Sequence, residues 1–341
     1  MNDDVVILGD LHFGQAKSEK WTEDNQKKLI DTLYEYCLVN KITRIIQCGD
    51  FFDNRKALKH NTLQFVRVEV VARFAAIGVH WDVIVGNHDM FYKTNVVPNA
   101  CEEILSNYEN FTVHNKPTTI KINDTEIDLI PWICQDNHDE VKQFIKDSNS
   151  FLCVGHFELA GFKYNQSIPS DGTDCNFLEG YHKVLSGHFH TQSDNGTVYY
   201  VGTPYHLNFN DADDKRGFWI LNTGTMDHTF VDSGFIHYTK VTYGDEGVAD
   251  RDFTNQRVRL STAVEDDNFK LFVSQISEVV NSLDIVYTND LIIDWGDGES
   301  EVNLEDTRTL VVNTINNLEI EVSDKEFITK SYDELYSKAM E

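Results

Sequence analysis

Short apolar runs alternate with longer amphipathic stretches over the first 243 residues of this 341-residue chain. The apolar runs have the length of buried strands and end at glycine or polar residues. They occupy residues 5–8, 44–48, 80–85, 126–130, 151–154 and 184–186. The stretches with helical spacing lie at about 22–39, 61–77, 98–107 and 137–147. Strands and helices in alternation predict an α/β fold.

A strong hairpin signal, Asn195-Gly196, begins a different pattern. Successive strands follow it, at 198–201, 217–221, 229–232 and 236–241. Together with the first part, they predict a two-sheet β-sandwich with helices outside, spanning residues 1–243.

A polar stretch at 244–252 precedes a smaller unit. The pattern predicts a strand at 256–264, a helix at about 267–283 and a strand at 284–294. We therefore expect a small α+β subdomain over residues 250–294.

The end of the chain predicts a linker at 295–303 and a helix pair at 304–341. Acidic residues and glycines fill the linker, and Ser323-x-x-Glu326 has the form of a capping box. The pair is too small to form much of a core alone. It therefore either packs on the main domain or docks on a partner.

Each of five predicted strands is followed by a short motif of glycine with Asp, Asn or His. The motifs are Gly9-Asp10-Leu11-His12, Gly49-Asp50-Phe51-Phe52-Asp53, Gly86-Asn87-His88-Asp89, Gly155-His156 and Gly187-His188-Phe189-His190. Ligands bind at the carboxyl ends of strands in α/β sheets, and glycine lets the backbone turn sharply there. Scattered turn residues are the alternative, but five such motifs in order favour one shared site.

These motifs offer carboxylate, imidazole and amide oxygen ligands without thiolate, which fits manganese, iron or zinc better than a structural zinc–thiolate site. Two divalent ions roughly 3.5–4 Å apart can hold a hydroxide and neutralise a phosphate. One carboxylate must bridge them. The motifs therefore predict a two-metal phosphoesterase centre.

The same motifs resemble the calcineurin-like metallophosphoesterase superfamily. The stretches IQCGDFFDNRKALKHNT, VGNHDMFYKTNVVPNA and VLSGHFHT resemble the SbcD-type recombination nucleases, including those of T-even phages. The similarity covers most of the chain and is strongest over residues 1–220. It implies a DNA endonuclease and 3′–5′ exonuclease of phage recombination and repair. It also implies manganese, or alternatively magnesium, as the metal, a cap beside the nuclease groove, and an SbcC-like ABC-type ATPase bound by the C-terminal helices.

Carried onto matching positions, the resemblance makes Asp50 the bridging ligand. It divides the other ligands into two sets, Asp10, His12 and His190 for one ion and Asn87, His156 and His188 for the other.

His88 follows a predicted ligand, so we expect it to protonate the leaving oxygen or steady the phosphate. Asp53 would orient His88 or a metal-bound water, although some family members have histidine at that position. Asp89 is expected to anchor its turn.

Four basic residues lie just beyond two of the motifs and are predicted to contact DNA phosphates. They are Arg55, Lys56, Lys59 and Lys93. Ordinary surface charge is the alternative interpretation.

The net charge of −27 is unusual for a nucleic-acid enzyme. Residues 245–341 hold 23 acidic and 8 basic residues, so this part is not expected to touch DNA. Weak intrinsic DNA affinity, with capture by the metals and a partner, would follow. Acidity that simply serves solubility is the alternative.

Six cysteines show no C-x-x-C pairing, which predicts reduced thiols and a cytoplasmic location, in the infected bacterial host if the chain is phage-encoded. The chain enters a predicted strand at once, so no signal peptide is expected. No apolar run approaches 18 residues, so we expect no membrane span.

The family resemblance also implies a homodimer through the helices at 61–77 and 98–107. Another enzyme on this fold, a phosphoprotein phosphatase or cyclic-nucleotide phosphodiesterase, is the alternative function, and the extension after residue 250 speaks against a minimal phosphatase. A non-catalytic scaffold would have lost ligands, and none is lost here.

Overall fold

The computed structural model describes residues 3–162, 170, 172–212, 214–288, 325, 328–330 and 332. The chain divides into two units, residues 1–290 and residues 291–341. The predicted linker and most of the predicted C-terminal helix pair lie outside the described residues. The described positions of the tail are helical.

Two six-stranded sheets form the main body, as an α/β fold predicts. The first has the order β14-β13-β1-β2-β3-β6. Its strands are β1 (Asp4–Leu8), β2 (Arg44–Gln47), β3 (His80–Ile84), β6 (Phe111–His114), β13 (Gly217–Asn222) and β14 (His228–Asp232). The strands β1, β2, β3 and β6 run parallel, and β13 and β14 complete the sheet antiparallel.

The second sheet has the order β11-β12-β10-β9-β8-β7. Its strands are β7 (Thr118–Ile122), β8 (Thr125–Ile130), β9 (Leu152–His156), β10 (Lys183–Gly187), β11 (Ser193–Asp194) and β12 (Val198–Tyr200). The four strands β8, β9, β10 and β12 pair in parallel. The edge strands β7 and β11 pair antiparallel with β8 and β12.

Alternation of side chains along each strand explains how the sheets pack. Val5 and Ile7 of β1 share a buried cluster with Leu129 of β8 and Val154 of β9, so these faces of the two sheets meet. Val6, on the opposite face of β1, belongs to a second cluster that the helices cover. The two sheets therefore form a sandwich with helices outside.

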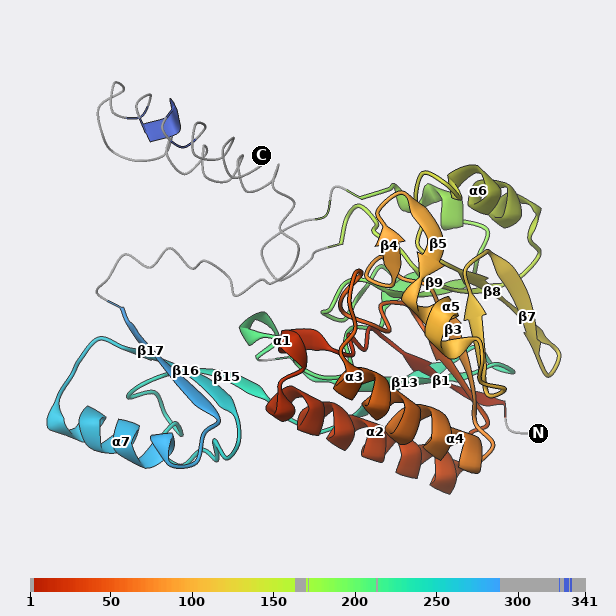
Figure 1. Cartoon of the computed structure of the whole chain (residues 1–341). Coiled ribbons are helices and arrows are strands. Elements are labelled where there is room, and N and C mark those ends of the chain that lie inside the picture. Colours follow the sequence, from red (N-terminus) through yellow and green to blue (C-terminus); the bar gives the residue numbers. More distant parts are fainter. Residues whose placement is uncertain are drawn as a thin grey trace. The chain divides into compact units, whose positions relative to one another are not determined.

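Helices from the first half of the chain cover the outer face of the first sheet (Figure 1). They are α2 (Lys20–Asn40), α3 (His60–Phe65), the π-helical η1 (Val66–Ala72), α4 (Arg73–Ala76) and α5 (Ala100–Leu105). The amphipathic α6 (His138–Asp147) contributes Val141 to the cluster on the outer face of the second sheet. Three short turns complete the body, namely α1 (Gln15–Ser18), η2 (Cys175–Leu178) and η3 (Phe209–Asp211).

The segment after the third motif differs from our expectation of a helix at 98–107. It begins as a hairpin of β4 (Met90–Tyr92) and β5 (Asn95–Asn99). Asn99 then caps α5, because its side chain accepts a hydrogen bond from Glu102 N at 2.8 Å. The helix therefore starts two residues later than predicted and has only six residues.

A separate three-stranded parallel sheet lies in the last part of the first unit. It consists of β15 (Tyr238–Thr242), β16 (Arg257–Thr262) and β17 (Ser282–Tyr287), with α7 (Asp267–Ser277) packed on it. The helix was expected to run to 283. It ends earlier because residues from 282 onward pair with β16, which places Leu283 and Ile285 against its core.

None of the six cysteines, all within the described residues, forms a disulfide. Among the helices that the structure describes, none is both long enough and apolar enough to cross a membrane.

Candidate metal centre

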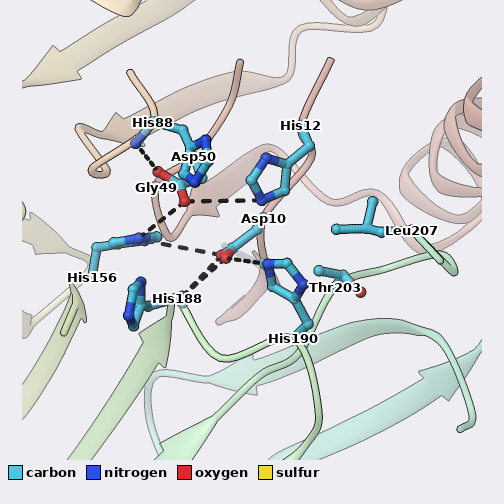
Figure 2. A network of polar contacts seen from close by, with 12 residues as sticks. Asp10, His12, Gly49, Asp50, His88, His156, His188, His190, Thr203 and Leu207 are labelled. Carbon is cyan, nitrogen blue, oxygen red and sulfur yellow. Dashed lines mark hydrogen bonds and ion pairs between the residues drawn. The ribbon is translucent and has the colours of Figure 1, made fainter. Parts of the chain in front are cut away.

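Five parallel strands from both sheets carry the predicted ligands at their carboxyl ends. Asp10 and His12 follow β1, Asp50 follows β2, Asn87 and His88 follow β3, His156 ends β9, and His188 and His190 follow β10. Figure 2 shows most of these side chains pointing toward one another around Asp10 and Asp50. The structure therefore brings all seven predicted ligands into one cluster.

One group of ligand atoms comes from Asp10, His12 and His190, which all lie within 4.8 Å of one another. The Nε2 atom of His190 lies 4.0 Å from Oδ2 of Asp10. Asp10 and His12 are buried. Nε2 of His12 has no hydrogen-bond partner among the described residues. A buried, unpartnered ring nitrogen beside carboxylates fits a metal ligand.

A second group comes from Asp50, His156 and His188, again within 4.8 Å of one another. Asn87 joins it, because its Oδ1 lies 2.9 Å from Nε2 of His156 and 3.1 Å from Nδ1 of His188. Nε2 of His156 also lies 3.3 Å from Oδ2 of Asp50.

The tautomer of His156 shows why this group needs a cation. Its Nδ1 faces the carbonyl oxygen of Cys48 at 2.8 Å, so Nδ1 carries a proton. In a neutral ring Nε2 would be a lone pair that points at two oxygen acceptors, those of Asp50 and Asn87. Burial lowers the pKa of His156, but Asp50 and Asp10 raise it to about 9, so without a metal the ring holds a second proton. Only a proton or a metal ion between these atoms makes the contacts favourable. The donor set and this geometry fit a divalent metal.

Asp50 contacts both groups. Its Oδ2 lies 3.3 Å from His156 and 3.9 Å from Nε2 of His12, and its Oδ1 accepts a hydrogen bond from the backbone N–H of His88 at 2.7 Å. Burial alone would raise its pKa, but the charges of His156 and His88 hold the pKa well below its usual range. This carboxylate therefore has the placement and charge of a bridge, and its role as a ligand remains a prediction.

Burial also sets the charge of the neighbouring ligands. It raises the pKa of Asp10 to about 7, and it lowers the pKa of His190 to about 3. Burial and the charge of His156 hold the pKa of His188 well below its usual value. His188 and His190 are consequently neutral near pH 7, which is the form of imidazole that binds metals.

Backbone strain at the site falls on three of the predicted ligands. His12, Asp50 and His188 have φ values of 44°, 53° and 90°, in the left-handed region that side chains disfavour. Gly49 does have a positive φ, of 103°. Strained backbone of this kind clusters at functional sites.

Most of the other motif glycines serve close packing instead. A Cβ on Gly86 would lie 2.2 Å from Oδ1 of Asp50, and one on Gly187 would lie 2.5 Å from Oδ1 of Asp10. Glycine at these positions lets the ligands of different strands approach one another. The chain does turn at Gly86, where Asp89 N–H donates a hydrogen bond to the backbone oxygen of Gly86 at 3.3 Å, but neither Gly86 nor Gly187 has a positive φ.

Asp53 and His88 lie beside the first group. The Oδ1 atom of Asp53 is 3.1 Å from Nδ1 of His12, whereas its backbone oxygen accepts a hydrogen bond from Nδ1 of His88 at 2.8 Å. The carboxylate therefore contacts His12, and it is the backbone of Asp53 that contacts His88. Because Nδ1 of His88 faces a carbonyl oxygen, only Nε2 of that ring can exchange a proton with a substrate.

Asp89 anchors its turn. Its carboxylate is buried and accepts hydrogen bonds from the backbone N–H groups of Phe51, Phe52 and Gly86 at 2.9–3.3 Å. It thereby joins the second and third motifs.

The chain matches no protein-family model. It is 39% identical over 337 residues to exonuclease subunit 1 of Enterobacteria phage T4, an alignment that covers 98% of this chain and 99% of the phage protein. The chain belongs to the exonuclease subunit 1 family. It is thus a nuclease of the SbcD type, which the motifs indicated.

A more distant relative is the DNA double-strand break repair protein Mre11 of Nanoarchaeum equitans, 18% identical over 244 residues, covering 64% of this chain and 66% of that protein. Among solved structures, an archaeal phosphodiesterase is 13% identical with a TM-score of 0.35, covering 67% of this chain and 99% of that one. The family assignment rests on the phage relative.

In this member of the exonuclease subunit 1 family, the four basic residues predicted to bind DNA lie on two segments. Arg55 and Lys56 line a cavity of about 200 Å³ with Phe91, and Lys93 lies at the turn of the β4–β5 hairpin. The ammonium group of Lys59 donates a hydrogen bond to the backbone oxygen of Lys17. The structure therefore places all four beyond the second and third motifs.

Two residues near the centre had no predicted role. The ring of Trp132 lies against the rings of His188 and His156, with centroids 4.9 and 5.8 Å apart. Arg216 donates a hydrogen bond to the backbone oxygen of His190. Trp132 lies in the stretch IDLIPWIC, which resembles the SbcD-type nucleases. This resemblance was the only sequence feature that could have marked Trp132 as part of the site. Arg216 stands in a run of charged residues, which reads as exposed surface.

Proposed function

We propose that this chain hydrolyses phosphodiester bonds of DNA, as endonuclease and 3′–5′ exonuclease, with two divalent ions held by the seven clustered side chains. The single observation that carries the proposal is the position of Asp50, whose Oδ2 lies close to one imidazole from each ligand group. A bridging carboxylate is what a two-metal centre requires. The names of the phage and archaeal relatives support DNA as the substrate.

We infer that manganese is the working metal. Two such ions would supply a hydroxide nucleophile and neutralise the phosphate. The chain contributes oxygen and imidazole donors to both groups, which suits manganese and also tolerates magnesium at the oxygen ligands.

His88 is the proposed proton donor to the leaving oxygen. Its backbone N–H is bonded to Asp50 and its Nδ1 to Asp53, so the ring has a fixed direction. Nε2 would donate its proton to the leaving oxygen. The ring must be an imidazolium to do so, because Nδ1 retains its proton in the hydrogen bond to the carbonyl oxygen of Asp53. Asp53, through Nδ1 of His12, would orient that predicted ligand.

Substrate contacts are proposed for Arg55, Lys56, Lys59 and Lys93. Their support is placement, because the loop after Asp53 and the hairpin after Asp89 both start at the centre. Phosphate contacts there would fix the register of the DNA without reading its sequence.

For the domains we propose residues 1–243 as the nuclease, 250–294 as a cap, 295–303 as a linker and 304–341 as the segment that binds an SbcC-like ATPase. The last strand of the nuclease segment, β15, pairs with β16 of the cap and not with either sheet of the sandwich. A homodimer through the helical segments 61–77 and 98–107 is also proposed. Val68 of η1, 45% exposed, supports that surface.

The proposal is tested by purifying the full chain and adding manganese to three substrates side by side. Single-stranded circular DNA and a linear duplex should be cut, and p-nitrophenyl phosphate esters should be poor substrates. Asp50→Asn should leave at most a few per cent of the DNA cleavage. The control is Asp128→Asn, which changes a buried carboxylate that is bonded to Ser148, Ser150 and Tyr181 and touches no predicted ligand.

Efficient ester hydrolysis with intact DNA would favour the alternative, a phosphoprotein phosphatase or cyclic-nucleotide phosphodiesterase on this fold. More than a few per cent of DNA cleavage by Asp50→Asn, with two metals still bound, would disprove the bridge.

A further inference from the structure

His190 stands in a loop and not in a strand. β10 ends at Gly187 and β11 begins at Ser193, so residues 188–192 have no ladder hydrogen bonds to fix them. A metal ligand must nevertheless be held to within about 0.2 Å. Contacts outside the sheet must therefore position this histidine.

Arg216 supplies such a contact. Its Nη1 donates hydrogen bonds to the backbone oxygen of His190 and, at 2.6 Å, to Oγ1 of Thr203. The backbone N–H of Thr203 donates to the same oxygen of His190 at 3.0 Å. Two donors, Nη1 of Arg216 and the backbone N–H of Thr203, therefore hold the backbone oxygen of the predicted ligand His190.

Asp214 links Arg216 to the residue that follows His190. Its Oδ2 accepts a hydrogen bond from Nη2 of Arg216 at 2.9 Å and another from the hydroxyl of Thr191, the next residue after His190, at 3.0 Å. Asp211 lies 3.0 Å from Nη2 of Arg216 as well. Two consecutive loop residues are thus tied to one ion pair.

Burial makes this ion pair stiff. The side chain of Arg216 is 1% exposed, and such a buried guanidinium is costly unless its hydrogens are satisfied. The planar fork of arginine fixes the direction of each hydrogen bond, which a lysine ammonium cannot reproduce. Acceptors around Nη1 and Nη2 hold the guanidinium in one place, and it holds the loop, while Nε has no partner among the described residues.

We propose that Arg216 and Asp214 form a clamp that positions the ring of His190 and so sets the affinity of the metal site made by Asp10, His12 and His190. The inference rests on the proposed two-metal function. Both are positioning residues, since neither touches the predicted ligand atoms. Loss of a residue that orients a metal ligand typically costs 10–100-fold in metal affinity.

The test is a calorimetric titration of the full metal-free chain with manganese chloride, for wild type and Arg216→Met, with thermal unfolding as a second readout. Wild type should bind two ions. Arg216→Met should bind one with wild-type affinity and the other about 10–100-fold more weakly. Arg216→Lys should recover part of the loss.

Arg44→Met is the matched control. Arg44 pairs with the buried Asp82 at 2.6 Å, and neither residue touches a predicted ligand. This variant should unfold at a lower temperature yet bind both ions as wild type does. A general effect of removing an arginine from a buried carboxylate is thereby separated from the clamp.

If Arg216→Met does not fold, Asp214→Asn decides, because Asp214 is partly exposed and asparagine keeps its size. It should weaken the same single site. Two unchanged sites in whichever variant folds would overturn the clamp alone. Fewer than two sites in wild type would overturn the proposed function, and the clamp with it.

Discussion

A single methyl group added at Gly187 is a sharp test of how the centre is packed. Gly187 is the last residue of β10 and is itself no ligand. A Cβ there would lie 2.5 Å from Oδ1 of Asp10, 2.6 Å from the backbone oxygen of Cys48 and 2.9 Å from Nδ1 of His156. Gly187→Ala therefore pushes on two predicted ligands without removing any donor atom.

The size of the effect follows from these distances. An ordinary contact of a Cβ is 3.4 Å or more, so the nearest oxygen must move by roughly 1 Å. Overpacking a well-filled interior costs about 1–3 kcal/mol of stability. A displacement of that size near the chemistry costs about 10²-fold in rate. It also exceeds the tolerance of about 0.2 Å for metal–ligand distances.

Gly180→Ala provides the matched control. An added Cβ at Gly180 meets no atom within 4 Å, and its φ is not in the left-handed region. This variant should keep full activity and gain at most about 1 kcal/mol of stability. Manganese titration, thermal unfolding and DNA cleavage would be measured on both. Wild-type metal binding and cleavage by a folded Gly187→Ala would refute the packing argument.

Three further outcomes are expected. His88→Ala should bind both metals normally but cleave DNA roughly 10²–10⁴-fold more slowly; calorimetry that showed a lost metal would make His88 a ligand. Asp82→Asn should cost about 1–3 kcal/mol of unfolding free energy near pH 7, because the buried carboxylate is bonded to His114 and to Arg44, which is 30% exposed and can return to water. Burial raises the pKa of Asp82, but these two bonds lower it below the usual value. The stability that the bonds give is therefore present above about pH 4 and is lost as the pH falls. A difference in unfolding free energy between wild type and Asp82→Asn that grew in acid would contradict this. A chain cut at about residue 300 should keep metal-dependent cleavage of small substrates and lose co-purification with an SbcC-like ATPase; full-strength co-purification would assign the ATPase contact to another segment.

The strands that carry the ligands could be predicted because each has a mainly apolar run. The run 5–8 is buried on both faces and all its side chains are apolar, and a polar motif marks where it ends. Strands β6 and β7 were missed for the opposite reason. Residues 118–122 read TTIKI and alternate in exposure, which a short sequence window does not distinguish from a loop.

The helix expected at 98–107 shows a different limit. The apolar residues Val96 and Val97 lead up to it, and Pro98 and the cap at Asn99 separate strand from helix. Such a boundary depends on one side chain accepting one backbone hydrogen bond. Boundaries of this kind are the least predictable part of a fold.

The candidate ligands could be named from motifs, whereas the residues that hold them could not. Arg216 lies 26 positions after His190 along the chain, and its partners Asp211 and Asp214 belong to the same charged run. Nothing local distinguishes a buried arginine there from an exposed one. Its place depends on the path of the chain between β12 and β13.

Both ligand groups draw from both sheets. Asp10 and His12 come from the first sheet and His190 from the second, while Asp50 from the first stands with His156 and His188 from the second. An ion in either group would cross-link segments that lie more than one hundred residues apart, as a disulfide does. Sliding of one sheet over the other would break both groups at once. Parting of the two sheets, and with it the rate of unfolding, should then depend on metal concentration. Bound metal would thus stabilise the fold in addition to its proposed role in catalysis.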